Sequence, residues 1–142
     1  MNTSVKQGSV IVGVDGSAGG AVALEWAAHH ASVRHRPLVL AHGAGDPTAS
    51  SRFVGAQDAR QRLRHEAHLV TDHALGVVHT LAPTVDVQVT APLHDARQVL
   101  LELSDRASIV VVGTRGRGPL GALLLGSVST AVAEHASAVQ GS

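Results

Sequence analysis

The chain has 142 residues, of which 44% are hydrophobic and 15% charged, and its formal net charge at pH 7 is zero. This length predicts one domain over residues 1–142, and the balanced charge provides no general attraction to nucleic acid or to an anionic membrane. The absence of cysteine excludes disulfides, thiolate metal sites and thiol catalysis. With no apolar run of membrane-spanning length and no signal-peptide pattern, we expect a cytoplasmic protein with neither a nucleic-acid nor a membrane partner.

Short apolar segments alternate with longer segments of helical spacing along the whole chain. The apolar segments are rich in β-branched residues and predict strands over residues 9–14, 37–42, 85–90 and 108–112. The amphipathic segments predict helices over about residues 21–33, 57–81, 95–106 and 127–138, with Asp95 as an N-cap. The strand over residues 85–90 alternates apolar and polar side chains, which favours a place near the edge of the sheet.

Strands that alternate with helices predict an α/β fold with an open parallel sheet and helices on both faces. In such sheets a ligand binds outside the carboxyl ends of the strands, at the point where the strand order reverses. Residues 43–56 have no periodicity and are rich in Gly, Ala and Ser, so we expect a loop there.

A glycine motif follows the predicted strand at 108–112. It begins as Gly113-Thr114-Arg115-Gly116 and, nine residues later, ends as Gly126-Ser127 at the start of the predicted last helix. Glycines allow a backbone to approach an anion closely, and the N-terminus of a helix directs free N–H groups and a positive dipole toward it. This arrangement indicates a phosphate cradle and therefore a nucleotide-binding protein.

These residues resemble the universal stress protein family. The resemblance covers about residues 9–138 and rests on Val-Ile-Val-Gly-Val-Asp-Gly-Ser at 10–17, Ala-Leu-Glu-Trp-Ala at 23–27 and the Gly-x2-Gly-x9-Gly-Ser motif. It points to the ATP-binding branch of the family, with a Rossmann-like sheet of strand order 3-2-1-4-5. It implies a stress-response regulator that holds ATP between strands one and four, with Mg²⁺ carried on the phosphates.

The resemblance also implies a set of site residues. Val14 and Asp15 would line the adenine and ribose side, Gly43 would offer its backbone to the adenine edge, and Gly113 would lie near the ribose. The phosphates would be held by Gly116, Gly126 and Ser127, with the N–H groups of Val128 and Ser129 close by. No catalytic or metal-ligating residue is assigned.

The end of the chain departs from the family pattern. Residues 135–142 read His-Ala-Ser-Ala-Val-Gln-Gly-Ser, whereas in the family the last helix is followed by a fifth strand of Val-x-Val-Val type. We therefore expect the strand order 3-2-1-4 with the fifth strand absent. Strand four would then expose Val110, Val111 and Val112 at the sheet edge, which favours a protein partner that supplies a strand or an atypical homo-oligomer.

Several alternatives stay open. The protein could be a slow ATPase or an autophosphorylating enzyme that uses Ser127, Ser129 or Thr130, or a nucleotide-free interaction module; no P-loop lysine or evident general base is present. Asp15 could cap the first helix as well as contact a ligand. His65 and His68 lie three residues apart, which would suit a metal, but a solvated helix face is the better interpretation.

Overall fold

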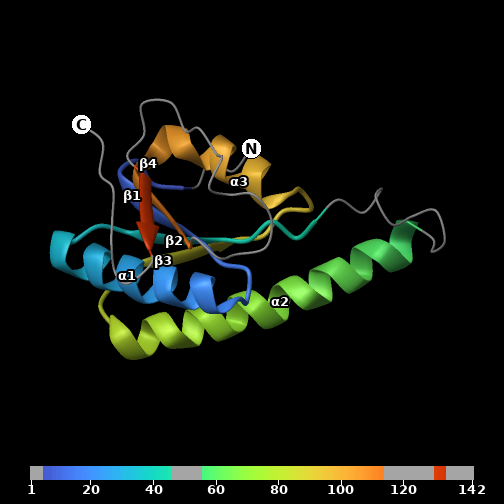
Figure 1. Cartoon of the computed structure of the whole chain (residues 1–142), viewed down its shortest axis with the longest axis horizontal. Coiled ribbons are helices and arrows are strands. Elements are labelled where there is room, and N and C mark those ends of the chain that lie inside the picture. The colour runs from blue at the N-terminus through green and yellow to red at the C-terminus, as the bar shows by residue number, and fades with distance from the viewer. Residues whose placement is uncertain (1–4, 46–55, 114–129, 134–142) are drawn as a thin grey trace.

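The computed structural model describes residues 5–45, 56–113 and 130–133 (Figure 1). The elements alternate between strand and helix as expected up to β4. In chain order they are β1 (Ser9–Gly13), α1 (Ala18–Arg34), β2 (Leu38–Ala41), α2 (Ala56–Leu81), β3 (Val87–Thr90), α3 (Ala96–Leu103), the 3₁₀ turn η2 (Ser104–Arg106), β4 (Ala107–Gly113) and β5 (Thr130–Ala133).

The strands form one parallel sheet in the order β3-β2-β1-β4-β5. This confirms the α/β fold class and the order 3-2-1-4, and β3 lies at the edge, as its alternating pattern predicts. Helices α1 and α2 cover one face of the sheet, and α3 covers the other (Figure 1). The order reverses at β1, because the chain moves from β1 to β2 on one side and returns to β4 on the other.

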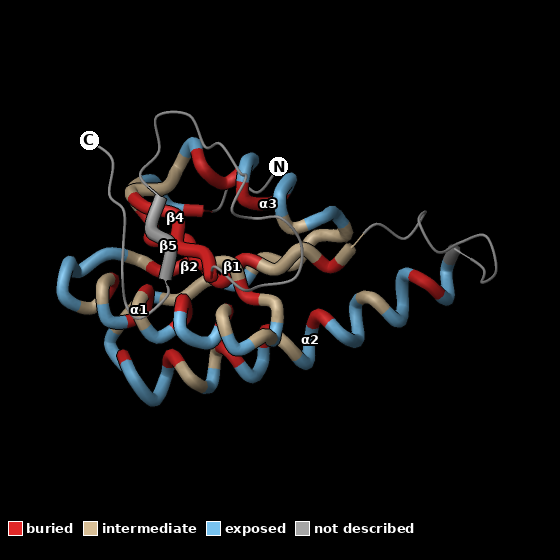
Figure 2. The backbone as a smooth tube through the Cα atoms, in the orientation of Figure 1, coloured by how far each residue is buried: buried red, intermediate tan, exposed pale blue. Residues whose placement is uncertain are grey.

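Two apolar clusters, one on each face, hold the layers together. Alternate strand residues face α1 and α2, and the residues between them face α3, as the period of two in a strand requires. Figure 2 shows that the buried positions concentrate in β1, β2 and β4. The first cluster includes Val10, Val12, Leu38, Leu40, Ile109 and Val111, and the second includes Ile11, Val39, Leu100, Val110 and Val112.

The two capped helices begin at polar residues that the sequence places directly before them. Asp95 accepts a hydrogen bond from the backbone N–H of Gln98 at 2.7 Å, which confirms it as the N-cap of α3. Ser17 is the N-cap of α1, and its Oγ accepts from the N–H of Gly20 at 3.0 Å. Such caps satisfy donors that have no partner inside the helix.

The expectations of no fifth strand and of a helix through residues 130–133 are wrong. Thr130–Ala133 forms β5 and pairs in parallel with β4, from Val110 opposite Thr130 to Gly113 opposite Ala133. An unpaired edge on β4 would leave its backbone N–H and C=O groups without partners beside three buried valines, and β5 supplies those partners. The edge of β4 is therefore paired rather than open. The expectations of a partner that supplies a strand and of an atypical homo-oligomer depended on that open edge.

None of the helices in the described part of the chain is long and apolar enough to cross a membrane.

Candidate functional site

A cavity of about 250 Å³ opens at the carboxyl ends of β1, β2 and β4, where the strand order reverses. Four residues expected at the nucleotide site line it together, although they come from three separate segments: Val14, Asp15, Gly43 and Gly113. The other lining residues are Gly13, Gly20, Ala41, His42, Ala44, Gly45, Leu63, Glu66, Ala96 and Leu100. This place in the fold is where open α/β sheets bind ligands.

The turn between β1 and α1 fixes Asp15 at the cavity. Its Oδ1 accepts a hydrogen bond from the Ser17 backbone N–H at 2.9 Å and another from the Ser17 hydroxyl. Ser17 in turn accepts from the first turn of α1, so Asp15 orients the N-cap of that helix rather than capping it directly. Asp15 therefore combines a structural role with a place in the wall of the cavity.

Gly43 and Gly113 are sites where two backbones touch. A Cβ added at Gly113 would lie 2.4 Å from the Gly19 carbonyl oxygen, and one at Gly43 would lie 2.3 Å from the backbone nitrogen of Ala96. The family resemblance implies that these glycines lie beside a ligand. The structure adds that they let α1 and α3 begin directly against the ends of β4 and β2, which shapes the cavity.

His42 and Glu66 also line the cavity and were missed from the sequence. His42 follows β2 directly, and the ring Nδ1 lies 2.7 Å from the carbonyl oxygen of Val14, which joins the ends of β2 and β1. Glu66 comes from α2, one turn after Leu63. His42 could have been predicted as a lining residue, because it is the chain neighbour of Gly43. Glu66 could not, because only the packing of α2 brings it to the cavity.

The phosphate half of the predicted site lies outside the described residues. This holds for Gly116, Gly126, Ser127, Val128 and Ser129. The cavity of about 250 Å³ is slightly below the roughly 300–1,000 Å³ usual for small-molecule sites.

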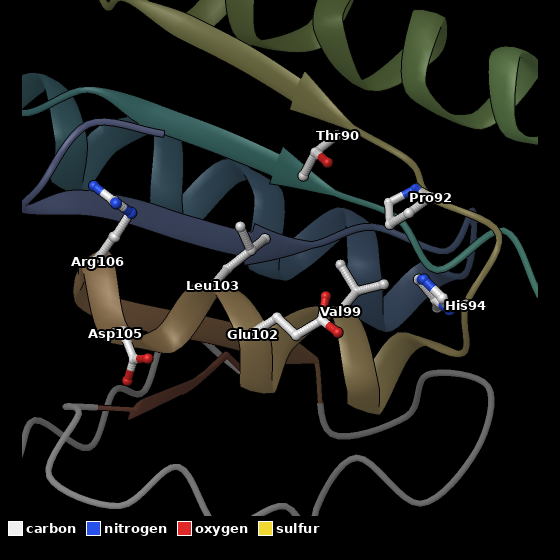
Figure 3. Close-up of a pocket in the computed structure, with 8 residues that line it drawn as sticks. All are labelled: Thr90, Pro92, His94, Val99, Glu102, Leu103, Asp105 and Arg106. Atoms are coloured by element: carbon white, nitrogen blue, oxygen red, sulfur yellow. The ribbon is translucent and has the colours of Figure 1, made fainter. Parts of the chain in front are cut away.

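A groove of about 480 Å³ lies between α3 and the end of β3 (Figure 3). Val99 and Leu103 point from α3 toward the sheet, and Asp105 points away from it (Figure 3). Of the predicted site residues that the structure describes, Val14, Asp15, Gly43 and Gly113, none lines this groove. Among the described residues that line it there is no glycine to allow close approach to phosphate, so its size alone does not make it the better candidate.

A third cavity, also of about 480 Å³, lies between α1 and α2. It is lined largely by apolar side chains, including Leu24, Leu69, Val70 and Val77. It shares Val14, Asp15 and Gly20 with the cavity at the strand ends, so the β1–α1 turn separates the two.

Among the described residues, no group of three or more His, Asp or Glu side chains is placed to hold a metal ion. His65 and His68 are both exposed on α2.

An open parallel α/β sheet with a cavity at its strand reversal defines the class of doubly wound, Rossmann-like domains. A sequence model of the Universal stress protein family matches residues 8–138, and the chain belongs to this family. A universal stress protein of Mycolicibacterium smegmatis is 34% identical over 96% of this chain and 48% of the relative. The chain thus spans about half the length of the curated relatives it matches.

Solved structures support the fold. A universal stress protein from Archaeoglobus fulgidus in complex with dAMP superposes with a TM-score of 0.66 at 17% identity, over 90% of this chain and 97% of that one. An Arabidopsis thaliana family member with AMP bound superposes with a TM-score of 0.58 at 16% identity, over 89% and 92%. At these identities the likeness establishes the fold alone.

Proposed function

We propose that this protein is an ATP-binding regulatory domain of the stress response, with the nucleoside part of ATP in the cavity at the ends of β1, β2 and β4. One observation carries the proposal: Val14, Asp15, Gly43 and Gly113, all expected at a nucleotide site, line a single cavity at the strand reversal. Related structures with dAMP and AMP bound support it.

In this proposal the phosphates extend from Gly113 toward the glycine motif. Gly116, Gly126 and Ser127 would hold them, together with the N–H groups of Val128 and Ser129. The residues present suit a phosphate chain, because the sequence from Gly113 to Ser127 is rich in glycine, which allows close backbone approach, and contains no carboxylate. Mg²⁺ would be carried by the phosphates, and a cytoplasmic location belongs to the same proposal.

Isothermal titration with Mg-ATP tests the proposal. We expect saturable binding, weakened by roughly tenfold in Asp15→Asn, because an amide keeps the side-chain size but accepts hydrogen bonds from the nucleoside hydroxyls less strongly than a carboxylate does. Asp105→Asn is the matched control, because Asp105 is exposed and lines the groove beside α3 instead. It should bind as the wild type does.

The absence of binding heat at millimolar Mg-ATP would rule the proposal out. Phosphate release or covalent labelling from γ-labelled ATP, measured in the same samples, would identify the protein as an enzyme rather than a regulator that only binds.

A further inference from the structure

The two ends of the strand-end cavity differ chemically. Gly113 lies at the end formed by β4, whereas residues 42–45, Leu63 and Glu66 form the opposite end beside β2. Two strand spacings, about 10 Å, separate β2 from β4. If ATP binds as proposed, its phosphates lie at the glycine end and its base lies against residues 42–45.

Three backbone donors at the base end are already engaged. The backbone N–H groups of His42, Ala44 and Gly45 already donate to the carbonyl oxygens of Thr90, Pro92 and His94, at 2.9, 3.0 and 3.1 Å. These bonds tie the loop after β2 to the loop after β3. With these backbone donors engaged, the polar side chains that line the base end are those of His42 and Glu66.

The tautomer of His42 follows from its own contact. Nδ1 lies 2.7 Å from the carbonyl oxygen of Val14, and a carbonyl oxygen can only accept, so Nδ1 carries the proton and donates it. In a neutral imidazole ring the other nitrogen is then an acceptor. Because Nδ1 is engaged with Val14, Nε2 is the ring nitrogen that His42, a lining residue, keeps for a ligand, and Glu66 lines the same cavity with a carboxylate that also accepts.

We propose that His42 Nε2 reads the exocyclic amino group of a purine and makes this site select 6-aminopurine over 6-oxopurine nucleotides. The inference rests on the proposed function and names the residue that decides which base binds. An amino group donates to Nε2, whereas a 6-oxo group presents an oxygen to it, and two acceptors facing each other leave both unsatisfied.

The probe pair is AMP and IMP, which differ at the 6-position amino or oxo group and at N1. Titration in mildly alkaline buffer, which favours neutral imidazole rings in general, should give about tenfold tighter binding of AMP to the wild type. In His42→Asn the amide nitrogen takes the place of Nδ1 and can still donate to Val14, but no atom replaces Nε2. This variant should bind AMP and IMP with equal affinity.

Two further variants separate His42 from its surroundings. His42→Gln places an amide at the position of Nε2, which can accept from an amino group or donate to an oxo group, so IMP should bind more tightly than it does to the wild type. Glu66→Gln changes the other acceptor of the same wall and should keep the preference for AMP.

The possible failures are distinct. If neither AMP, IMP nor ATP binds the wild type, the proposed function fails and this inference fails with it. If AMP and IMP bind the wild type equally, or if the preference survives in both His42 variants, the inference is wrong while the proposed function stands. Loss of the preference in Glu66→Gln alone would assign the base-reading role to Glu66 and overturn it for His42.

Discussion

At the scale of single residues, glycine marks the places where this protein brings backbones into contact. The clearest case is Gly43, where an added Cβ would lie 2.3 Å from the nitrogen and 2.5 Å from the Cα of Ala96. Both are backbone atoms at the start of α3, so a rotamer change cannot relieve the contact. Gly76, by contrast, lies in the exposed part of α2 with no atom within 4 Å of an added Cβ.

These two glycines make a matched pair. Gly43→Ala should lower the free energy of unfolding by about 1–3 kcal/mol, because α3 must move away from β2. Gly76→Ala should raise it by about 0.5–1 kcal/mol, because alanine is the better helix former at an open position. Urea denaturation of both variants measures the difference, and a stabilising Gly43→Ala would contradict the close packing of α3 on the end of β2.

A second residue-scale prediction concerns His30. Burial lowers the pKa of His30 below its ordinary value, and the positive charges of Arg34, Arg36 and His29 lower the pKa further. The unfolded chain therefore takes up this proton more readily than the folded protein. The His30 contribution is present at neutral pH, and it is lost as the pH falls through the ordinary histidine value toward the lower folded one.

His30→Gln should consequently reduce the loss of stability between about pH 7.5 and pH 5.5, since the titrating group is gone. The His30 ring stacks on Trp26 with centroids 4.7 Å apart, and Trp26 is the single tryptophan of the chain, so its fluorescence can follow unfolding. The exposed His79→Gln is the control. An unchanged pH dependence in His30→Gln would remove His30 as the cause.

At the scale of elements, the strand β5 is the feature that sequence patterns misassign. Residues 127–138 have helical spacing, yet Thr130–Ala133 pairs with β4. On an edge strand, neighbouring residues direct their N–H groups alternately toward the sheet and away from it. A helix has no such alternation, so proline substitution distinguishes the two structures.

We therefore expect Ala131→Pro and Val132→Pro to differ. The variant that loses an N–H directed at β4 should be destabilised by about 3 kcal/mol or more, and the other should be tolerated at the edge. Thermal melting of both variants measures this difference. Equal and severe destabilisation would instead support a helix through these residues.

At the scale of the whole molecule, the layered arrangement explains why the candidate site lies where it does. Strand β1 is buried between α1 and α2 on one face and α3 on the other, and the parallel sheet extends from it through β2 on one side and through β4 on the other. Helices α1 and α3 both begin at the carboxyl ends of the strands, and they lie on opposite faces of the sheet. The space between their first turns is the cavity lined by Asp15, His42 and Gly113.

The sequence alone determined the alternation of strands and helices up to β4, the edge position of β3 and the cap at Asp95. These features depend on local properties: apolar periodicity, β-branched residues and side chains that bond to nearby backbone. Its resemblance to the universal stress protein family also indicated Val14, Asp15, Gly43 and Gly113.

Only the tertiary structure decided what depends on contacts between distant segments. It paired Thr130–Ala133 with β4, because the need to satisfy the hydrogen-bonding groups of an open edge outweighed a weak helical pattern. It placed Glu66 and His42 in one cavity wall and fixed the His42 proton through Val14, a contact between residues 28 positions apart. No local pattern encodes such contacts, since they arise only when helices pack across the ends of the strands.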